Sequence, residues 1–236
     1  MSNSFHKGPV WLQVFVPTKQ HHTRPENSQE NLNFVKSYQP RNKEVKHLRI
    51  LLIGPVGSGK SSFINSVDGV FQDRITGRAA VDAVIGGSVT NKYTTYKISK
   101  DPEGSYSFVF NDTMGFERSA GRGVHVEDIK LALKGHVKDG YKFCASTGIP
   151  QLVLITKIDE ACPKVRRNIK NAYWSKFLKE QVDKFICLLG IPLNCIFLVK
   201  NYHSETRISD DIDALILVAL REMVYFGEDF LNKLQD

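Results

Sequence analysis

The sequence predicts an α/β fold in which a mostly parallel β-sheet carries helices on both faces. Short, continuous apolar runs at 48–53 ("LRILLI"), 151–157 ("QLVLITK") and 195–200 ("CIFLVK") are typical of strands buried on both faces. Segments whose apolar residues recur with the period of an α-helix separate these runs. Strands and helices therefore alternate along the chain, which is the pattern of a parallel sheet.

Local patterns predict the individual elements. Residues 92–99 and 105–112 alternate polar and apolar side chains around the turn "KDPEGS", so they predict a hairpin. Helices are expected over 60–71, 126–143, 168–189 and 208–231. The third of these should bury one apolar stripe, made of Trp174, Phe177, Leu178, Val182 and Phe185.

Composition divides the chain near residue 47. Residues 1–47 hold seven of the 32 Lys and Arg and three of the 25 Asp and Glu, so they carry +4 of the net charge of +7. We expect a basic, mostly disordered leader over 1–47, with "PVWLQVFVP" as a candidate docking strand, and a single domain over 48–236. The leader lacks a dense Lys/Arg block, so a solvated linker is favoured and nucleic acid binding is not expected.

The cysteines and the apolar runs indicate a cytoplasmic protein. The four cysteines stand singly, without metal-binding or redox spacing, and no secretory signal precedes them. They are expected to be reduced thiols. The longest apolar run near the start, 10–16, is far shorter than the roughly 20 residues that span a bilayer. No transmembrane segment is therefore expected.

A phosphate-binding loop is predicted at 54–61, where "GPVGSGKS" fits G-x-x-x-x-G-K-[ST] between a predicted strand and a predicted helix. Glycines let backbone N–H groups turn toward an anion, and the helix N-terminus adds partial positive charge. Lys60 is expected to bridge the β- and γ-phosphates, and the Ser61 hydroxyl to bind Mg²⁺. The alternative is a glycine-rich turn with a solvent-facing lysine. The expected nucleotide contacts here are Gly54, Pro55, Val56, Gly57, Ser58, Gly59, Lys60, Ser61 and Ser62.

Two further segments supply candidate ligands for the metal ion and the γ-phosphate. Asp112 and Gly115, in "NDTMG", match the D-x-x-G of guanine-nucleotide proteins. Asp112 would hold Mg²⁺ through water, and the Gly115 N–H would contact the γ-phosphate. Thr90, in "GGSVTNKY", is placed to bring a hydroxyl to Mg²⁺. A strand-end aspartate and a loop threonine also occur without such roles.

The base is predicted to be guanine. Thr156, Lys157 and Asp159, in "TKID", match [NT]-K-x-D at the end of a predicted strand. The Asp159 carboxylate can accept hydrogen bonds from guanine N1 and N2, which adenine lacks as donors, and the Lys157 stem can pack over the base. Asn201, in "VKNYHS", is a further candidate for a guanine contact. The predicted cofactors are GTP or GDP with Mg²⁺ in a P-loop NTPase-like three-layer sandwich.

Several of these segments resemble the interferon-induced protein 44 family of GTPase-like proteins. The segments are "LRILLIGPVGSGKSSFINSV", "NDTMGFE", "ALKGHVKDGYKF" and "GIPQLVLITKIDEACP". The resemblance implies a guanine-nucleotide-binding (G) domain over 48–236, in a cytoplasmic protein of the interferon-induced immune response that is associated with antiviral defence. It also implies a separate N-terminal domain, in place of which this chain has the 47-residue leader.

The chain departs from the family between 143 and 151, where only "CASTGIP" connects a predicted helix to a predicted strand. The family has a further strand and helix there, and that strand lies beside the phosphate-loop strand. We therefore expect a shortened form whose sheet lacks one central strand. In that case 151–157 would slide into the vacant slot and move Asp159 by about 4.8 Å, or would leave ladder groups unpaired. A central strand supplied by another segment, such as "VWLQVFV" at 10–16, would contradict this expectation.

The sequence does not identify a catalytic residue. Phe116 follows the D-x-x-G motif, where many GTPases place a water-orienting glutamine. Arg118 and Arg122 are candidates for arginine fingers, within the chain or across a homodimer. We expect a guanine-nucleotide-binding protein with slow or no hydrolysis. The alternatives are an interaction protein that binds a protein partner without nucleotide, and an ATPase of the same sheet class.

Overall fold

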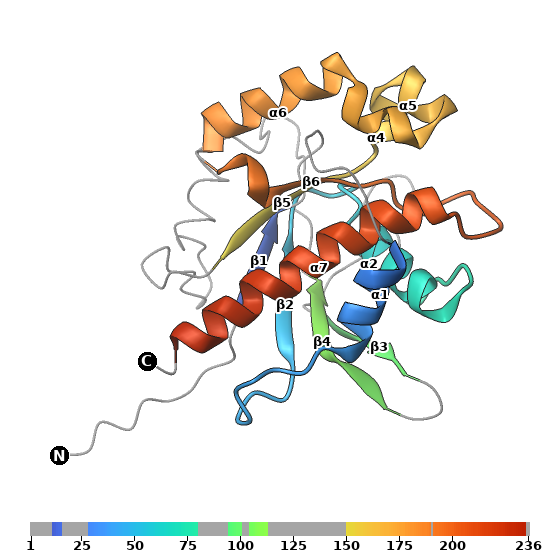
Figure 1. Cartoon of the computed structure of the whole chain (residues 1–236). Helices are drawn as coiled ribbons and strands as arrows, with labels where there is room; N and C mark the ends of the chain where they lie inside the picture. The colour runs from blue at the N-terminus through green and yellow to red at the C-terminus, as the bar shows by residue number, and fades with distance from the viewer. Residues whose placement is uncertain are drawn as a thin grey trace.

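A computed structural model describes residues 11–15, 28–79, 94–100, 104–112, 150–189 and 191–234, and the structural statements below concern those residues. They form an α/β structure around one six-stranded sheet (Figure 1). The strands are β1 (Trp11–Phe15), β2 (Leu48–Ile53), β3 (Thr94–Ser99), β4 (Ser105–Asp112), β5 (Gln151–Ile155) and β6 (Ile196–Leu198).

The sheet is mostly parallel, as predicted. Its strand order is β3-β4-β2-β1-β5-β6. β3 runs antiparallel to β4, and the other four neighbouring pairs are parallel. The antiparallel pair is the predicted hairpin, and the three predicted buried strands are β2, β5 and β6. Because parallel strands end at the same edge of a sheet, the carboxyl ends of β2, β4 and β5 lie at one edge.

The expected gap in the sheet is filled by β1, a segment of the predicted leader. Residues 11–15 lie between β2 and β5, so that Phe15 is opposite both Ile53 and Val153. The expectations of a missing central strand and a displaced β5 are therefore wrong. An empty slot would leave two rows of N–H and C=O groups unpaired, and an apolar, β-branched segment can pair with both. The leader is also ordered at 28–37, where it forms helix α1.

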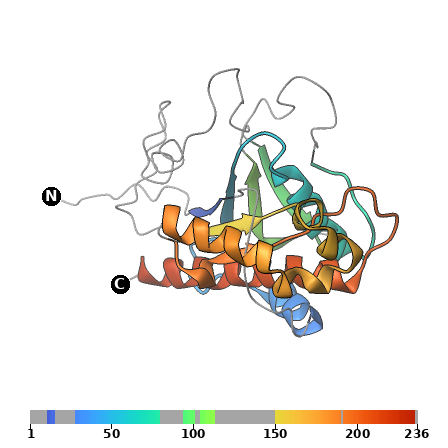
Figure 2. The same ribbon diagram turned by 90° about the horizontal axis from the view of Figure 1, so that it is seen from above.

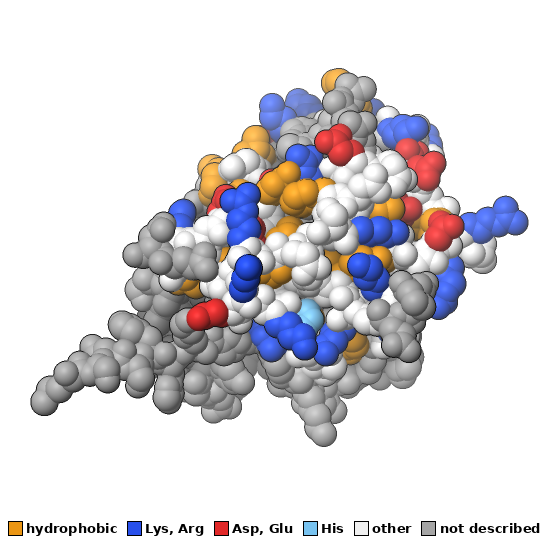
Figure 3. Space-filling model, turned by 60° about the horizontal axis from the view of Figure 1, so that its bottom comes forward, with side chains coloured by type: hydrophobic (Ala, Val, Ile, Leu, Met, Phe, Trp, Pro, Cys, Tyr) orange, Lys and Arg blue, Asp and Glu red, His pale blue; other side chains and the backbone are white. Residues whose placement is uncertain are grey.

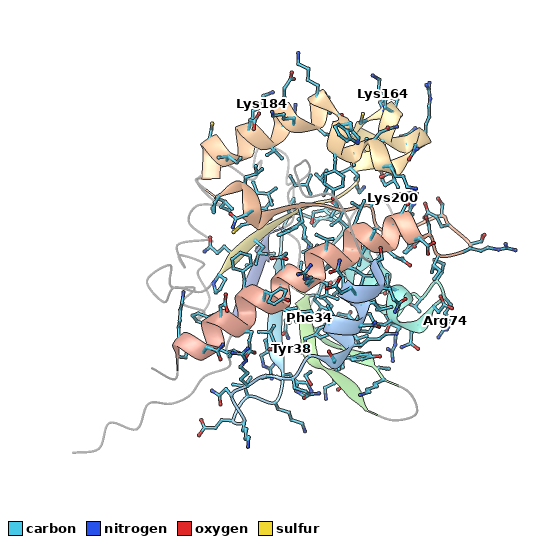
Figure 4. The ribbon with its side chains drawn as sticks, in the orientation of Figure 1. Phe34, Tyr38, Arg74, Lys164, Lys184 and Lys200 are labelled. Atoms are coloured by element: carbon cyan, nitrogen blue, oxygen red, sulfur yellow. The ribbon has the colours of Figure 1, made fainter. Side chains whose placement is uncertain are left out.

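Three helices cover one face of the sheet: α1 (Ser28–Ser37), α2 (Lys60–Gln72) and α7 (Asp210–Lys233). α2 and α7 pack on the sheet, and α1 lies against α7 on the side away from the sheet (Figure 2). The ring of Phe34 in α1 stacks on Tyr225 in α7 with centroids 4.4 Å apart, and the Tyr38 hydroxyl donates to Glu228 at 2.8 Å (Figure 4). The core on this face contains Ile50, Leu52, Phe63, Phe108, Phe110, Leu152, Leu154, Leu220 and Met223.

The opposite face of β5 and β6 carries α4 (Ile158–Ala161), α5 (Pro163–Arg167), η2 (Ile169–Trp174), α6 (Lys176–Leu189) and η3 (Leu193–Cys195). Their apolar residues form a second core with Val153, Ile155 and Leu198. No helix in the described part of the chain is long and apolar enough to cross a membrane. The predicted helix over 126–143 lies outside the described residues.

The predicted helix over 168–189 is interrupted at Ser175. A 3₁₀ helix precedes this residue and α6 follows it. Leu178 and Val182 are buried as predicted, but the prediction was wrong for Trp174 and Phe177, which are 78% and 40% exposed. The Ser175 hydroxyl accepts from the Leu178 N–H at 3.2 Å, so a helix start was hidden inside an apparently continuous pattern.

The pairing of β1 predicts that the Gln13→Pro variant will unfold at a lower denaturant concentration than the wild type. Gln13 lies opposite Leu51 and Gln151, so proline would remove a ladder hydrogen bond between two neighbours. We expect Gln13→Pro to lower the free energy of unfolding by about 3 kcal/mol in urea titrations. Gln13→Thr keeps the N–H group and should unfold close to the wild type. Equal stability of the three proteins would show that residues 11–15 are not the central strand.

Candidate functional site

The turn at 54–59 joins β2 to α2 in a conformation that exposes the start of the helix. Gly57 and Gly59 have positive φ angles of 72° and 89°, which residues with a Cβ rarely adopt. Gly59 is the N-cap of α2, and no side chain caps the helix there. The first N–H groups of a helix have no intrahelical acceptor, so this turn has the donors that an anion requires.

Lys60, the first residue of α2, lies over the turn instead of pointing into solvent. Its side chain is buried, and Nζ donates to the carbonyl oxygens of Gly54 at 3.0 Å and Pro55 at 3.1 Å. The alternative of a solvent-facing lysine is therefore wrong. The positive charge is held beside the uncapped helix start, and both features favour an anion at the same place.

Ser61 and Asp112 meet where the ends of β2 and β4 lie side by side. Asp112 is buried, and its position in β4 is opposite Leu52 in β2. The Ser61 hydroxyl donates to Asp112 Oδ2 at 2.6 Å. A hydroxyl and a carboxylate are oxygen ligands of the kind that Mg²⁺ prefers, and Mg²⁺ usually keeps several waters beside one or two protein oxygens. The pair therefore fits the predicted metal site.

The predicted base-recognition loop touches the turn at 54–59 directly. Thr156 follows β5, is buried, and donates from Oγ1 to the Ser58 carbonyl at 2.6 Å. Lys157 adopts a left-handed conformation with φ 57°, and α4 begins at the next residue. The Lys157 ammonium lies 3.7 Å from Glu160, and Asp159 keeps 14% of its side chain exposed. The loop thus keeps a carboxylate at the surface beside the turn.

Asn201 holds the same turn from another loop. Its Nδ2 donates to the Gly59 carbonyl at 2.9 Å, and its buried Oδ1 has no hydrogen-bond partner among the described residues. A Cβ added to Gly59 would lie 2.8 Å from Asn201 Nδ2 and 3.5 Å from Thr156. In this structure the amide that we expected to contact guanine therefore contacts the turn. Glycine at 59 allows this close approach.

Sequence reasoning missed the neighbours of Asn201. Lys200, labelled in Figure 4, lies between two carboxylates: it pairs with Glu205, and its Nζ is 3.9 Å from Asp159 Oδ2. Burial alone would raise the pKa of Glu205, but hydrogen bonds from Lys200 and from backbone N–H groups outweigh it and lower the pKa to about 2. The adjacency of Lys200 to Asn201 in "VKN" was the available signal.

Tyr202 anchors the loop that carries Lys200 and Asn201. Its N–H donates to Ser66 Oγ in α2 at 2.9 Å. Its hydroxyl donates to Asp213 Oδ1 at 2.6 Å and accepts from the Ser209 N–H at 2.7 Å. Burial and the hydrogen bond to Asp213 raise the pKa of the Tyr202 hydroxyl and outweigh the backbone contact with Ser209, which lowers it, so the hydroxyl stays protonated and keeps its role as donor. The loop is thereby attached to both α2 and α7.

The structure brings most of the predicted site together. Val56 and Ser62 flank the turn and the start of α2 and are partly exposed. Thr90 and Gly115 lie outside the described residues, as do Phe116, Arg118 and Arg122. No cluster of three or more His, Cys, Asp or Glu side chains that could hold a metal ion occurs among the residues that the structure describes, and Ser61 and Asp112 are the predicted metal ligands that it does describe.

The contact between Gly59 and Asn201 predicts different effects of alanine at the two glycines of the turn. Nothing lies within 4 Å of a Cβ at Gly57, so Gly57→Ala should add only the strain of a left-handed backbone with a side chain. This strain should lower the free energy of unfolding by about 1–2 kcal/mol. Gly59→Ala also displaces the Asn201 amide, so we expect a larger loss of stability in urea unfolding. The additional loss of stability in Gly59→Ala, compared with Gly57→Ala, should be smaller when Asn201 is also replaced by alanine. An additional loss of the same size in the Asn201→Ala background would contradict the contact.

The low pKa of Glu205 predicts that its contribution to stability depends on pH. A carboxyl with a lowered pKa stabilises the fold above its ordinary value of 4.5, and this contribution is lost as the pH falls toward about 2. We expect the wild type to be more stable than Glu205→Gln at pH 7, and the difference to shrink between pH 4.5 and 2.5. A difference that does not change with pH would show that Lys200 does not hold this carboxylate.

Comparisons with known proteins identify relatives along most of the chain. No family model matches it. Over 85% of its length it is 31% identical to the interferon-induced protein 44-like of Homo sapiens, and over 86% it is 28% identical to the interferon-induced protein 44 of Mus musculus. The chain spans 56% and 60% of these relatives, little more than half of their length.

The alignments also bear on the segment expected to be absent. The match to the human 44-like protein runs over 253 positions, more than the 236 residues of this chain. That relative therefore has residues inside the aligned region with no counterpart here. The predicted resemblance is confirmed by these matches: the chain is a homologue of the interferon-induced 44 proteins.

Proposed function

We propose that the protein binds guanine nucleotides with Mg²⁺ through a P-loop NTPase-like site. The observation that carries the proposal is the attachment of the base-recognition loop to the phosphate loop. Thr156 Oγ1 donates to the Ser58 carbonyl and Asn201 Nδ2 to the Gly59 carbonyl. Motifs that lie about 100 and 140 residues apart in the chain thus converge on one turn, as a single ligand with phosphates and a base would require.

Residues of the turn would hold the phosphates. The N–H groups at the uncapped start of α2 would donate to phosphate oxygens, and the Lys60 ammonium would move from the Gly54 and Pro55 carbonyls to phosphate oxygens. Ser61 and Asp112 would hold Mg²⁺, which neutralises phosphate charge. Thr90 and Gly115 would complete this end of the site from segments outside the described residues.

Asp159 would select guanine. Its carboxylate can accept from N1 and N2 of the base, and the Lys157 stem would cover one face of the ring. Lys200 Nζ lies 3.9 Å from Asp159 and pairs with Glu205, so a positive charge lies beside the carboxylate that would accept from the base. β1 supports the proposal because it keeps β5, and with it Asp159, two strand positions from β2.

We propose slow or no hydrolysis, in the cytoplasm, as part of the interferon-induced immune response. Phe116 stands where many GTPases orient water with glutamine, and the structure does not describe the segment that holds Arg118 and Arg122. The relatives are named as interferon-induced proteins, which supports a role in that response, and we propose an association with antiviral defence as part of it. The nucleotide would then act mainly as a switch ligand, with a homodimer or another protein as partner.

One observation favours a second function, a nucleotide-independent interaction protein. Relatives carry an internal segment that has no counterpart in this chain, and β1 supplies the central strand from the N-terminal side. A sheet completed in this way can be stable without a working ligand site. The two functions differ in one expectation: substitutions of Lys60 and Asp159 should weaken the affinity for a guanine nucleotide only if the protein is a nucleotide-binding protein.

The test is a titration of nucleotide-free protein with a fluorescent GDP analogue and Mg²⁺. We expect GDP and GTP, but not ATP, to displace the analogue. Lys60→Ala should weaken binding about 10- to 100-fold, because a charged hydrogen-bond donor to phosphate is lost. The exposed and distant Lys97→Ala is the matched control. No binding by folded wild-type protein would favour the interaction protein, and displacement by ATP would favour the ATPase.

A base swap checks the role of Asp159. In Asp159→Asn the side chain offers an N–H donor where the carboxylate offered an acceptor, and xanthine carries an oxygen where guanine carries the N2 amine. We expect this variant to prefer xanthosine diphosphate to GDP in the same competition assay, with its melting temperature near that of the wild type. Unchanged preference for GDP would show that Asp159 does not read the base.

A further inference from the structure

The segment from Pro163 to Lys184 is more positively charged than the rest of the predicted domain over 48–236. It holds seven Lys and Arg and two Asp and Glu, a net charge of +5, whereas residues 48–236 together carry +3. Lys170 is paired with Asp211 at 3.2 Å. Six exposed cations of this segment form no ion pair with any described residue: Lys164, Arg166, Arg167, Lys176, Lys179 and Lys184.

These cations lie on an outer layer of the molecule. α5 and α6 stand beyond the sheet at the top of Figure 1, on the side away from α1. Lys164 and Lys184 project from α5 and α6 away from the core (Figure 4). We call the exposed side of α5, η2 and α6 the α5–α6 surface. This surface is the outer side of packed helices. It therefore suits a flat partner better than an extended peptide, which would need a groove.

Two aromatic side chains stand among the cations. Trp174 is 78% exposed and has no ring contact with any described residue, and Phe177 is 40% exposed. Phe177 and Lys184 are seven residues apart and therefore share one side of α6. Trp174 is the most exposed of the large hydrophobic side chains that the structure describes. Tryptophan beside lysines is the combination enriched where proteins meet the headgroup region of a bilayer.

We propose that the α5–α6 surface docks on anionic phospholipid membranes, with Trp174 at the headgroup boundary and the six cations over the lipid phosphates and carboxylates. The long Lys and Arg stems can lie along the boundary while their charges face the headgroups. Each basic side chain near an anionic surface raises partitioning roughly fivefold. One tryptophan alone gives weak binding, so the charges and the ring are both required.

The molecule carries a second group of cations that serves as a control. Lys46, Arg49 and Lys97 surround His47, and together with burial, the larger cause, they lower its pKa. Figure 3 shows a histidine with Lys and Arg side chains beside it on one face of the molecule. The described large hydrophobic residues that are exposed do not include a tryptophan there. This group has charge without the aromatic component of the α5–α6 surface.

The experiment is co-sedimentation of the full chain with vesicles of phosphatidylcholine alone or with 30% phosphatidylserine. We expect binding to the mixed vesicles only, decreasing as salt rises. Lys164→Gln with Arg166→Gln and Arg167→Gln should weaken it at least 20-fold. The matched triple variant Lys46→Gln, Arg49→Gln and Lys97→Gln removes equal charge from this second group and should weaken it less than threefold. Equal losses in the two triple variants would overturn the proposal.

Trp174→Ser separates a lipid contact from a charge effect alone. We expect a 5- to 20-fold loss of vesicle binding, whereas Leu193→Ser, at a residue that is 45% exposed, should bind like the wild type. Brominated lipids should quench wild-type fluorescence more than that of Trp174→Phe, since the chain has two tryptophans. Failure to bind mixed vesicles, or tighter binding to single-stranded RNA with the same variant pattern, would overturn the membrane assignment. Nucleotide titration of Trp174→Ser is a separate readout and should be unchanged.

Discussion

The pairing of β1 with both β2 and β5 is the constraint on which the rest of the structure depends. β2 leads into the turn at 54–59 and β5 leads into Thr156, and with β1 between them the two strands lie two strand spacings apart, about 9.6 Å. Without β1, closure of the sheet would bring them one spacing closer. Hydrogen bonds such as those from Thr156 and Asn201 to the turn tolerate changes in distance of only a few tenths of an ångström. The geometry of the site therefore depends on β1, a strand that comes from a distant part of the chain.

Much of the sheet could be predicted because its signals are local. β2, β5 and β6 are continuous apolar runs, and the hairpin of β3 and β4 surrounds a Pro- and Gly-containing turn, so each is visible within a short window. β1 was recognised as an apolar run that could dock and as the segment whose insertion would contradict a missing strand, but the favoured interpretation left the slot empty. Its position depends on a vacancy between strands that begin at residues 48 and 151, and no pattern within the leader reports that vacancy.

The candidate site shows the same division. The glycines, Lys60, Ser61, Asp112 and Thr156 were predicted from motifs, because an anion loop and a carboxylate at a strand end need those residue types at fixed spacing. Lys200 and Tyr202 were missed, since they act through one loop whose partners, Asp159, Ser66 and Asp213, come from three different elements. Asn201 was predicted from its position after the last strand, but its hydrogen bond to the Gly59 carbonyl was not, because motif position does not determine side-chain direction.

One residue, Ser175, accounts for both the failed helix prediction and the exposed tryptophan. Trp174, Leu178 and Val182 are spaced by four residues, so in an uninterrupted helix they would share one buried side. Ser175 has an extended backbone, and its hydroxyl and carbonyl accept from the N–H groups of Leu178 and Lys179, so α6 starts after it. The chain before Ser175 is no longer in phase with α6, and Trp174 turns outward while Leu178 and Val182 remain in the core beside Ile155. The Ser175 cap thus places Trp174 on the α5–α6 surface instead of in the core. Leu178 and Val182, which follow the cap, still pack in the core beneath α6.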